Sequence, residues 1–195
     1  MRELAQDRDC VREGRDLATD AVKNANPLCR AGAWLGCIIV LALTGCGGDE
    51  TPPVAPQGIE TTFPIAVGTA TVHLQLALAE QEMTRGLMER TDLRANQGML
   101  FVYREPQQMS FWMRNTPSPL EIGFFTSDGV LREVYPLIPF DERPVKSRRD
   151  DLQFAMEVLQ GWFDFTGVKP GDRIDLKAVA AALKVRGYSP GDYDL

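Results

Sequence analysis

The chain has 195 residues, of which 44% are hydrophobic and 25% charged, a balance that suits one globular domain with additional segments. The net charge is −6 and no basic stripe alternates with aromatic residues, so nucleic acid is not an expected partner. The chain has a single histidine, His73, and its four cysteines all precede residue 47, which excludes a disulfide framework and a Cys/His metal cluster from the rest of the chain.

Residues 1–45 are predicted to form a lipoprotein signal segment. Its last 15 residues, 31–45, are uncharged and apolar, which is shorter than the roughly 20 residues of a membrane-spanning helix but suits the core of a signal peptide. This run ends in Leu43-Thr44-Gly45-Cys46, which resembles the bacterial lipobox, so Cys46 is the expected lipidation site. The alternative is a short apolar helix that ends in Gly-Cys by chance. The polar residues 1–21 are long for a signal peptide, and a start codon assigned too far upstream would explain them.

Residues 46–60 are predicted to form the lipidated cysteine and a flexible tether, because this stretch is rich in proline and glycine. The expected location is therefore outside the cytoplasm, with the protein held by lipid on the periplasmic face of the outer or inner membrane, or on the cell surface.

Residues 61–177 are expected to form a compact, mainly β domain with short helices and an antiparallel, barrel-like sheet. Alternating or continuous apolar runs predict strands over residues 63–67, 72–78, 99–103, 109–114, 121–126, 130–137, 152–158 and 173–176. Helical spacing predicts short helices over residues 80–87 and 161–166. Residues 178–195 are read as a C-terminal helix and a loose tail.

Several motifs follow one another in a specific order. They are Arg85-Gly86-Leu87-Met88, Gly98-Met99-Leu100-Phe101, Phe111-Trp112-Met113-Arg114-Asn115-Thr116, Met156-Glu157-Val158 and Lys169-Pro170-Gly171-Asp172. Together they resemble domain-of-unknown-function family 192 over about residues 62–177. The resemblance implies a domain with no established activity, in a family with many exported and lipid-anchored members. This chain departs from the family pattern at Arg114, Glu121 and Phe154, where Lys, Asp and Tyr are usual.

The proposed site is a cluster of polar and aromatic residues around the third of these motifs. If residues 109–114 form a strand, Trp112 and Arg114 share one face, and an indole beside a guanidinium suits a sugar, a peptide or a carboxylate. The candidate ligand-binding residues are Arg85, Arg90, Trp112, Arg114, Asn115, Thr116, Glu121 and Glu157.

Three roles for these residues remain open. They could serve only the fold, through pairs between an arginine and a buried glutamate. They could bind a cell-envelope polymer or a small ligand. The alternative is a hydrolase that uses Glu121 and Glu157 as an acid–base pair, which requires the two carboxyl groups to converge in one pocket. No catalytic residue, metal or cofactor is assigned.

Overall fold

The computed structural model describes residues 55–195, so the predicted signal segment, Cys46 and the first part of the tether lie outside it. The strands are β1 (Thr62–Val67), β2 (Ala70–Ala77), β3 (Gln97–Gln107), β4 (Ser110–Phe111), β5 (Leu120–Thr126), β6 (Leu131–Leu137), β7 (Val145–Lys146) and β8 (Leu152–Leu159). The helices are α1 (Glu80–Arg85), α2 (Trp162–Thr166), α3 (Leu176–Val185) and the 3₁₀ turn η1 (Pro190–Tyr193).

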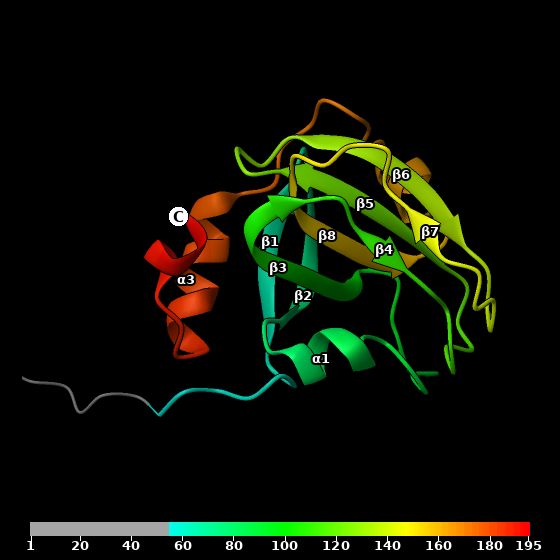
Figure 1. The fold of residues 1–195 in the computed structure, drawn as a ribbon, viewed down its shortest axis with the longest axis horizontal. Helices are drawn as coiled ribbons and strands as arrows, with labels where there is room; N and C mark the ends of the chain where they lie inside the picture. The colour runs from blue at the N-terminus through cyan, green and yellow to red at the C-terminus, as the bar shows by residue number, and fades with distance from the viewer. Residues whose placement is uncertain (1–54) are drawn as a thin grey trace, which may run out of the picture. The chain divides into compact units, whose positions relative to one another are not determined.

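Six of the strands form one curved sheet in the order β1-β2-β3-β8-β5-β6, and β4 pairs with β7 in a small second sheet (Figure 1). The expected mainly β fold is confirmed, but the sheet is open, with β1 and β6 at its edges, rather than closed into a barrel. It is also mixed, because β2 and β3 are parallel. The chain between them carries α1 and returns to the same end of the sheet, which a parallel pair requires.

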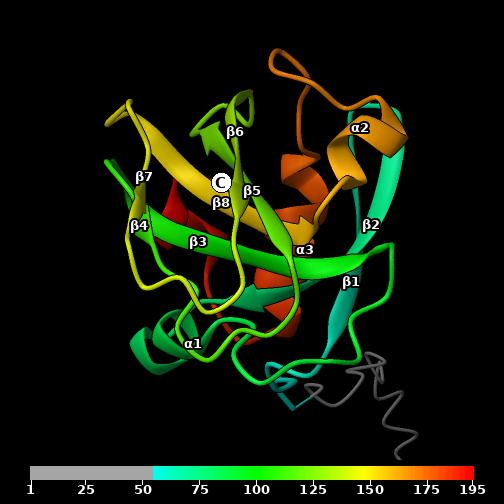
Figure 2. The same ribbon diagram turned by 90° about the vertical axis from the view of Figure 1, so that its right-hand side faces the viewer.

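Both faces of the large sheet are covered (Figure 2). Alternation along the strands sends Leu100 and Val158 to one face, where α2, α3 and η1 pack. Met99, Phe101 and Ile122 point to the other face, which lies under the end of α1 and the β4–β7 pair. The central strand β8 is therefore buried almost throughout.

The predicted strand over residues 109–114 is wrong beyond Phe111. After β4 the chain turns, because the Met113 N–H donates to the carbonyl of Asp141 and the Thr116 N–H donates to the carbonyl of Met113. Asn115 adopts a left-handed conformation in this turn, with φ of +52°. Trp112 and Arg114 thus lie on a loop and not on one face of a strand.

The C-terminal region also differs from expectation. Instead of a strand over residues 173–176, Arg173 and Ile174 make single β-bridges, and Asp175 accepts hydrogen bonds from the first N–H groups of α3. The tail after α3 is not loose, since Tyr193 is buried and its carbonyl accepts a hydrogen bond from Gln153.

The last residues of the predicted tether contact the domain. The Gln57 N–H donates to the carbonyl of Val185 at 3.0 Å, and Glu60 accepts a hydrogen bond from Gln75. Within residues 55–195, no helix is both long and apolar enough to cross a membrane.

Candidate functional site

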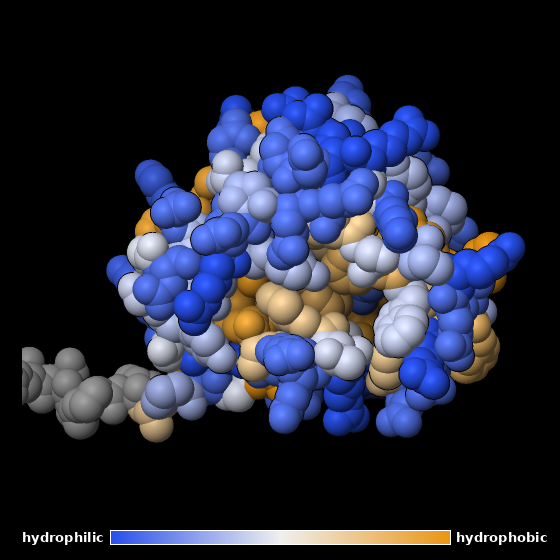
Figure 3. Space-filling model, in the orientation of Figure 1, coloured by the Kyte–Doolittle hydropathy of each residue, from blue (hydrophilic) through white to orange (hydrophobic). Residues whose placement is uncertain are grey.

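A groove runs beside α1 and is the most developed hollow near the predicted site. Met83 and Thr84 of α1 form one side, and Tyr103, Ser110 and Trp112 form the other. We call it the α1 groove. Its outer part has a volume of about 500 Å³ and its inner part about 80 Å³, and the two share these five residues. Figure 3 shows it as an apolar hollow between more hydrophilic surfaces.

The inner part of the groove ends at the carboxyl group of Glu157. This residue pairs with Met99 and Ile122 in the neighbouring strands, so its side chain points to the face of the sheet that lies under the end of α1. Glu157 is 4% exposed and, among residues 55–195, its carboxyl has no hydrogen-bond or ion-pair partner. Burial raises the pKa of Glu157 to about 8, so the carboxyl is mostly neutral at pH 7.

Access to this carboxyl depends on Gly86, which follows α1. A Cβ atom at Gly86 would lie 3.3 Å from the ring of Phe101 and 3.8 Å from Oε2 of Glu157. Gly86 also has φ of +49°, a conformation that favours glycine. The backbone after α1 can therefore pass directly over the floor of the groove without closing it with a side chain.

The walls of the groove come from irregular segments. The β3–β8 register breaks between Val102 and Gln107, and Tyr103 lies in this break with its ring half-buried in the groove. Burial, and then the charge of Glu157, raise the pKa of the Tyr103 hydroxyl. Trp112 lies on the loop after β4 and is 45% exposed, which is unusual for so large an apolar side chain.

The structure brings four of the eight predicted residues to this groove: Arg85, Trp112, Thr116 and Glu157. Arg85 is exposed at the rim and does not form the ion pair with a buried glutamate that a purely structural role would require. Thr116 is buried, and its hydroxyl donates to the carbonyl of Arg114 at 3.1 Å.

Arg114 and Asn115 lie beside the groove rather than in it. The guanidinium of Arg114 is 5.4 Å from the centroid of the Trp112 ring, close enough for a cation–π interaction, and its Nε lies 3.8 Å from Glu142. Asn115 is exposed, and its carbonyl accepts a hydrogen bond from the Glu89 N–H at 2.7 Å. Asn115 thus joins its own turn to the segment that follows α1.

Arg90 is used within the fold. Its guanidinium donates to Asp92 at 2.6 Å and to Gln75 at 3.1 Å, in a separate hollow of about 270 Å³ that it shares with Arg85. These contacts match a structural role.

Glu121 lies away from the groove and contradicts the predicted acid–base pair. It pairs with Val158, one residue further along β8 than Glu157, so the two glutamates point to opposite faces of the sheet. The carboxylate of Glu121 accepts a hydrogen bond from the Phe163 N–H at 2.7 Å, at the start of α2. No single pocket can hold both carboxyl groups, which removes the basis for the hydrolase.

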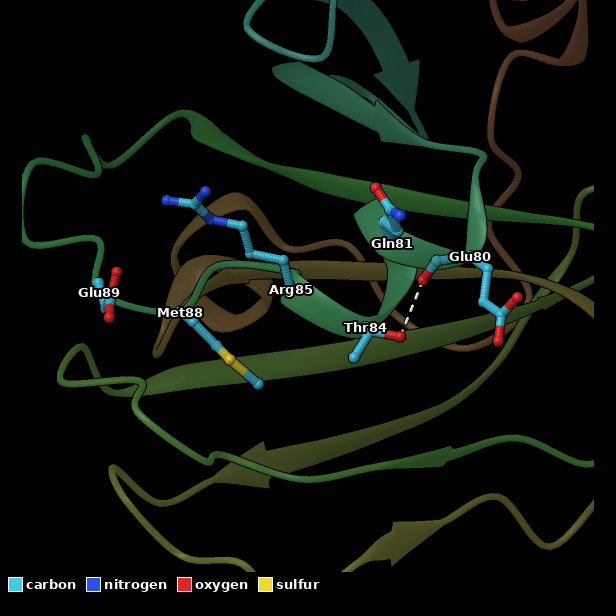
Figure 4. Close-up of a pocket in the computed structure, with 6 residues that line it drawn as sticks. All are labelled: Glu80, Gln81, Thr84, Arg85, Met88 and Glu89. Carbon is cyan, nitrogen blue, oxygen red and sulfur yellow. Dashed lines mark hydrogen bonds between the residues drawn. The ribbon is translucent and has the colours of Figure 1, made fainter.

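Another hollow, of about 630 Å³, lies along the exposed side of α1. Glu80, Gln81, Thr84, Arg85, Met88 and Glu89 line it (Figure 4), and none of them is buried. Figure 4 shows Arg85 and Met88 pointing in opposite directions. With no buried polar group to orient a ligand, this surface is a poorer candidate than the α1 groove.

The sequence did not indicate four of the five residues that define the groove, which are Met83, Thr84, Tyr103 and Ser110. Tyr103 was read as the end of a core strand, and Met83 and Ser110 as ordinary helix and strand residues. The sequence signal for Tyr103 was the charged and proline-containing run Arg104-Glu105-Pro106, which weakens a regular strand at that point.

Among the described residues, no group of three or more His, Cys, Asp or Glu side chains is placed to hold a metal ion.

Comparison with known proteins gives a family and two structural neighbours. The family model DUF192, described as "Uncharacterized ACR, COG1430", matches residues 63–176. A crystal structure from Sinorhizobium meliloti 1021, of a protein named as a candidate transcription regulator, is 29% identical with a TM-score of 0.57, over 61% of this chain and 96% of that one. A protein of unknown function from Novosphingobium aromaticivorans DSM 12444 is 30% identical with a TM-score of 0.56, over 62% of this chain and 91% of that one. No curated protein matches.

Proposed function

Because this chain belongs to the DUF192 family, which is uncharacterised, we propose its function from its own groove: it is a lipid-anchored protein of the cell envelope that binds a small ligand or a segment of an envelope polymer in the α1 groove. The proposal is for a binding protein and assigns no catalytic residue.

The observation that carries the proposal is the buried carboxyl of Glu157 at the inner end of the groove. A polar group that gives up water without gaining a hydrogen bond destabilises the folded protein by about 1–3 kcal/mol. A carboxyl that faces a hollow with no partner among the described residues therefore needs a reason to be retained. Strongly shifted carboxyl groups in a cleft are typical of functional sites. A bound ligand that reaches Glu157 would supply the missing partner.

The size and lining of the groove also support the binding of a ligand. Its outer volume of about 500 Å³ falls within the range of roughly 300–1,000 Å³ that is usual for ligand pockets. The exposed ring of Trp112 and the half-buried ring of Tyr103 offer flat apolar surfaces on which a sugar ring or a peptide can pack.

Membrane anchoring rests on the lipobox-like sequence that ends at Cys46. When the full chain is expressed in a bacterium, we expect the wild-type protein to fractionate with membranes and to carry the mass of the added lipid. The C46A variant should lack that mass and leave the membrane fraction. An unmodified Cys46 in the mature wild-type protein would contradict the anchor.

Nucleic-acid binding is not part of the proposal, although the Sinorhizobium meliloti protein is named for transcription. The net charge of this chain is −6, whereas binding to phosphates depends on concentrated positive charge.

Binding in the groove is tested by ligand-induced shifts in melting temperature. Wild-type protein is screened against cell-wall fragments, sugars and peptides, together with W112A and F165A. Phe165 is a matched control, because its ring is 91% exposed but belongs to α2, on the other face of the sheet. We expect stabilising ligands to lose at least tenfold in affinity with W112A and to keep it with F165A. No stabilising ligand, or equal losses in both variants, would contradict the proposal.

A further inference from the structure

The groove also carries an indication of the chemical class of its ligand. Its inner end combines a buried carboxyl with thioether and aromatic groups: Met83, Met88, Phe101, Phe111, Tyr103 and Trp112. A carboxylate that is enclosed by aromatic rings attracts an organic cation more strongly than it attracts any neutral group, because the ring faces and the carboxylate favour the same charge.

We propose that the α1 groove recognises a primary ammonium group, such as the end of a lysine side chain, which enters the inner part of the groove and pairs with Glu157. This inference rests on the proposed function, since it names the ligand class of the same groove.

The dimensions of the groove match such a ligand. The inner part, of about 80 Å³, has room for an ammonium group and one or two methylenes, while the outer part, of about 500 Å³, can hold the body of the ligand. Met83 and Trp112 line both parts, so an alkyl chain would lie between a thioether and an indole on its way to Glu157.

The charges around the groove allow a cation to enter. The ionisable groups that share the inner pocket with Glu157 are Arg85 and Tyr103. Arg85 is exposed at the rim and does not lower the pKa of Glu157, and Tyr103 is neutral at pH 7. The position beside the Glu157 carboxyl is therefore not occupied by a cation of the described chain.

Binding is coupled to the loss of one proton. In the free protein the Glu157 carboxyl holds its proton at pH 7. When R–NH₃⁺ enters, Glu157–COOH releases H⁺ to the solvent and the product is the pair Glu157–COO⁻···⁺H₃N–R, so charge and atoms balance. Below the pKa of Glu157, affinity should therefore increase about tenfold for each unit by which the pH is raised, because it follows the ionised fraction of the carboxyl.

The test compares two probes that differ only in the amine: Nα-acetyl-lysine methylamide and Nα-acetyl-norleucine methylamide. Isothermal titration calorimetry at pH 6 and pH 7, in phosphate and in PIPES buffer, neither of which carries a primary ammonium group, measures affinity and proton release. For the lysine probe we expect about one proton released at pH 7 and about tenfold tighter binding than at pH 6. The norleucine probe should bind at least tenfold more weakly at pH 7.

Variants separate the carboxyl from the fold. E157Q keeps the shape of the side chain and should lose both the preference for lysine and the pH dependence. E121Q is the matched control, because Glu121 is also buried but lies on the other face of the sheet, and its binding should match wild type. Nuclear magnetic resonance spectra of both variants establish that they are folded.

Equal binding of the two probes, no proton release, or tighter binding at pH 6 would overturn the ammonium assignment. The last result would mean that neutral Glu157 donates its proton to a ligand acceptor. The assignment also fails if neither probe binds, and the outcome of the library screen with W112A then decides separately whether the groove binds any ligand.

Discussion

At the scale of single residues, Glu121 and Glu157 show how a shift of one residue between paired strands changes the surroundings of a carboxyl group. Both are buried in adjacent strands of the same sheet. Glu121 receives the Phe163 N–H at the start of α2, whereas Glu157 has no partner among the described residues. The fold alone explains why Glu121 is buried, but it does not explain why Glu157 is.

The neutral state of Glu157 has a defined effect on stability. The ordinary pKa of a glutamate is 4.5, and burial raises that of Glu157 to about 8. Between these values the folded protein holds a proton that the unfolded chain has released. The free energy of unfolding must therefore fall as the pH rises through this window, which is the opposite of the effect of a carboxylate paired in the folded state.

Part of the groove was predictable from residue types. Their places within specific motifs marked Trp112 and Glu157 as candidates. The run after Tyr103 indicates only that the strand weakens there. The place of Tyr103 in the groove depends on a break in the β3–β8 register that apolar periodicity does not encode. The separation of Glu121 from Glu157 follows from strand pairing, which the sequence of either strand alone leaves open.

At the scale of elements, the position of α1 controls the groove. Glu82 in its first turn accepts hydrogen bonds from the N–H groups of Leu78 and Ala79 at 2.9 and 3.1 Å. Burial on its own would raise the pKa of Glu82, but these bonds and the charge of Arg186 lower it. Arg186 follows α3, is buried, and donates to Glu82 and to the carbonyl of Leu76, both at 2.5 Å.

We predict that R186M lowers the free energy of unfolding by about 3 kcal/mol, because it leaves the Glu82 carboxylate and the Leu76 carbonyl without their buried donor. Urea unfolding measures the change. K184M is the control, since Lys184 is exposed in the last turn of α3, and it should change stability by less than about 0.5 kcal/mol. Similar effects of the two variants would mean that Arg186 does not hold α1.

The short elements were the hardest to predict. Residues 109–114 have the alternation of a strand, yet hydrogen bonds from Met113 to Asp141 and from Thr116 to Met113 stop β4 after Phe111. The first of these bonds joins segments that are distant in sequence, whereas the second is a local turn. Longer strands such as β2, β5 and β8 were predicted to within a residue or two, because their apolar patterns extend over more positions.

At the scale of the whole molecule, the described residues form one β-rich unit in which the C-terminal segment takes part. The sequence favoured an antiparallel barrel-like sheet, but the crossover through α1 makes β2 and β3 parallel and the sheet stays open. That crossover is what brings α1 over the same face as Glu157. The groove thus results from the chain topology, and no local motif determines it alone.

The central claim is that the α1 groove ends at a buried carboxyl with no partner among residues 55–195, and the pH dependence of stability tests it most directly. The free energy of unfolding of wild type and E157Q is measured with urea at pH 5 and pH 9. From pH 5 to pH 9 the free energy of unfolding of wild type should fall by on the order of 4 kcal/mol relative to that of E157Q. The reason is that only wild type must ionise Glu157 in the folded state. A difference between the two proteins that does not change with pH would contradict the claim, since Glu157 would then be ionised and paired in the folded protein.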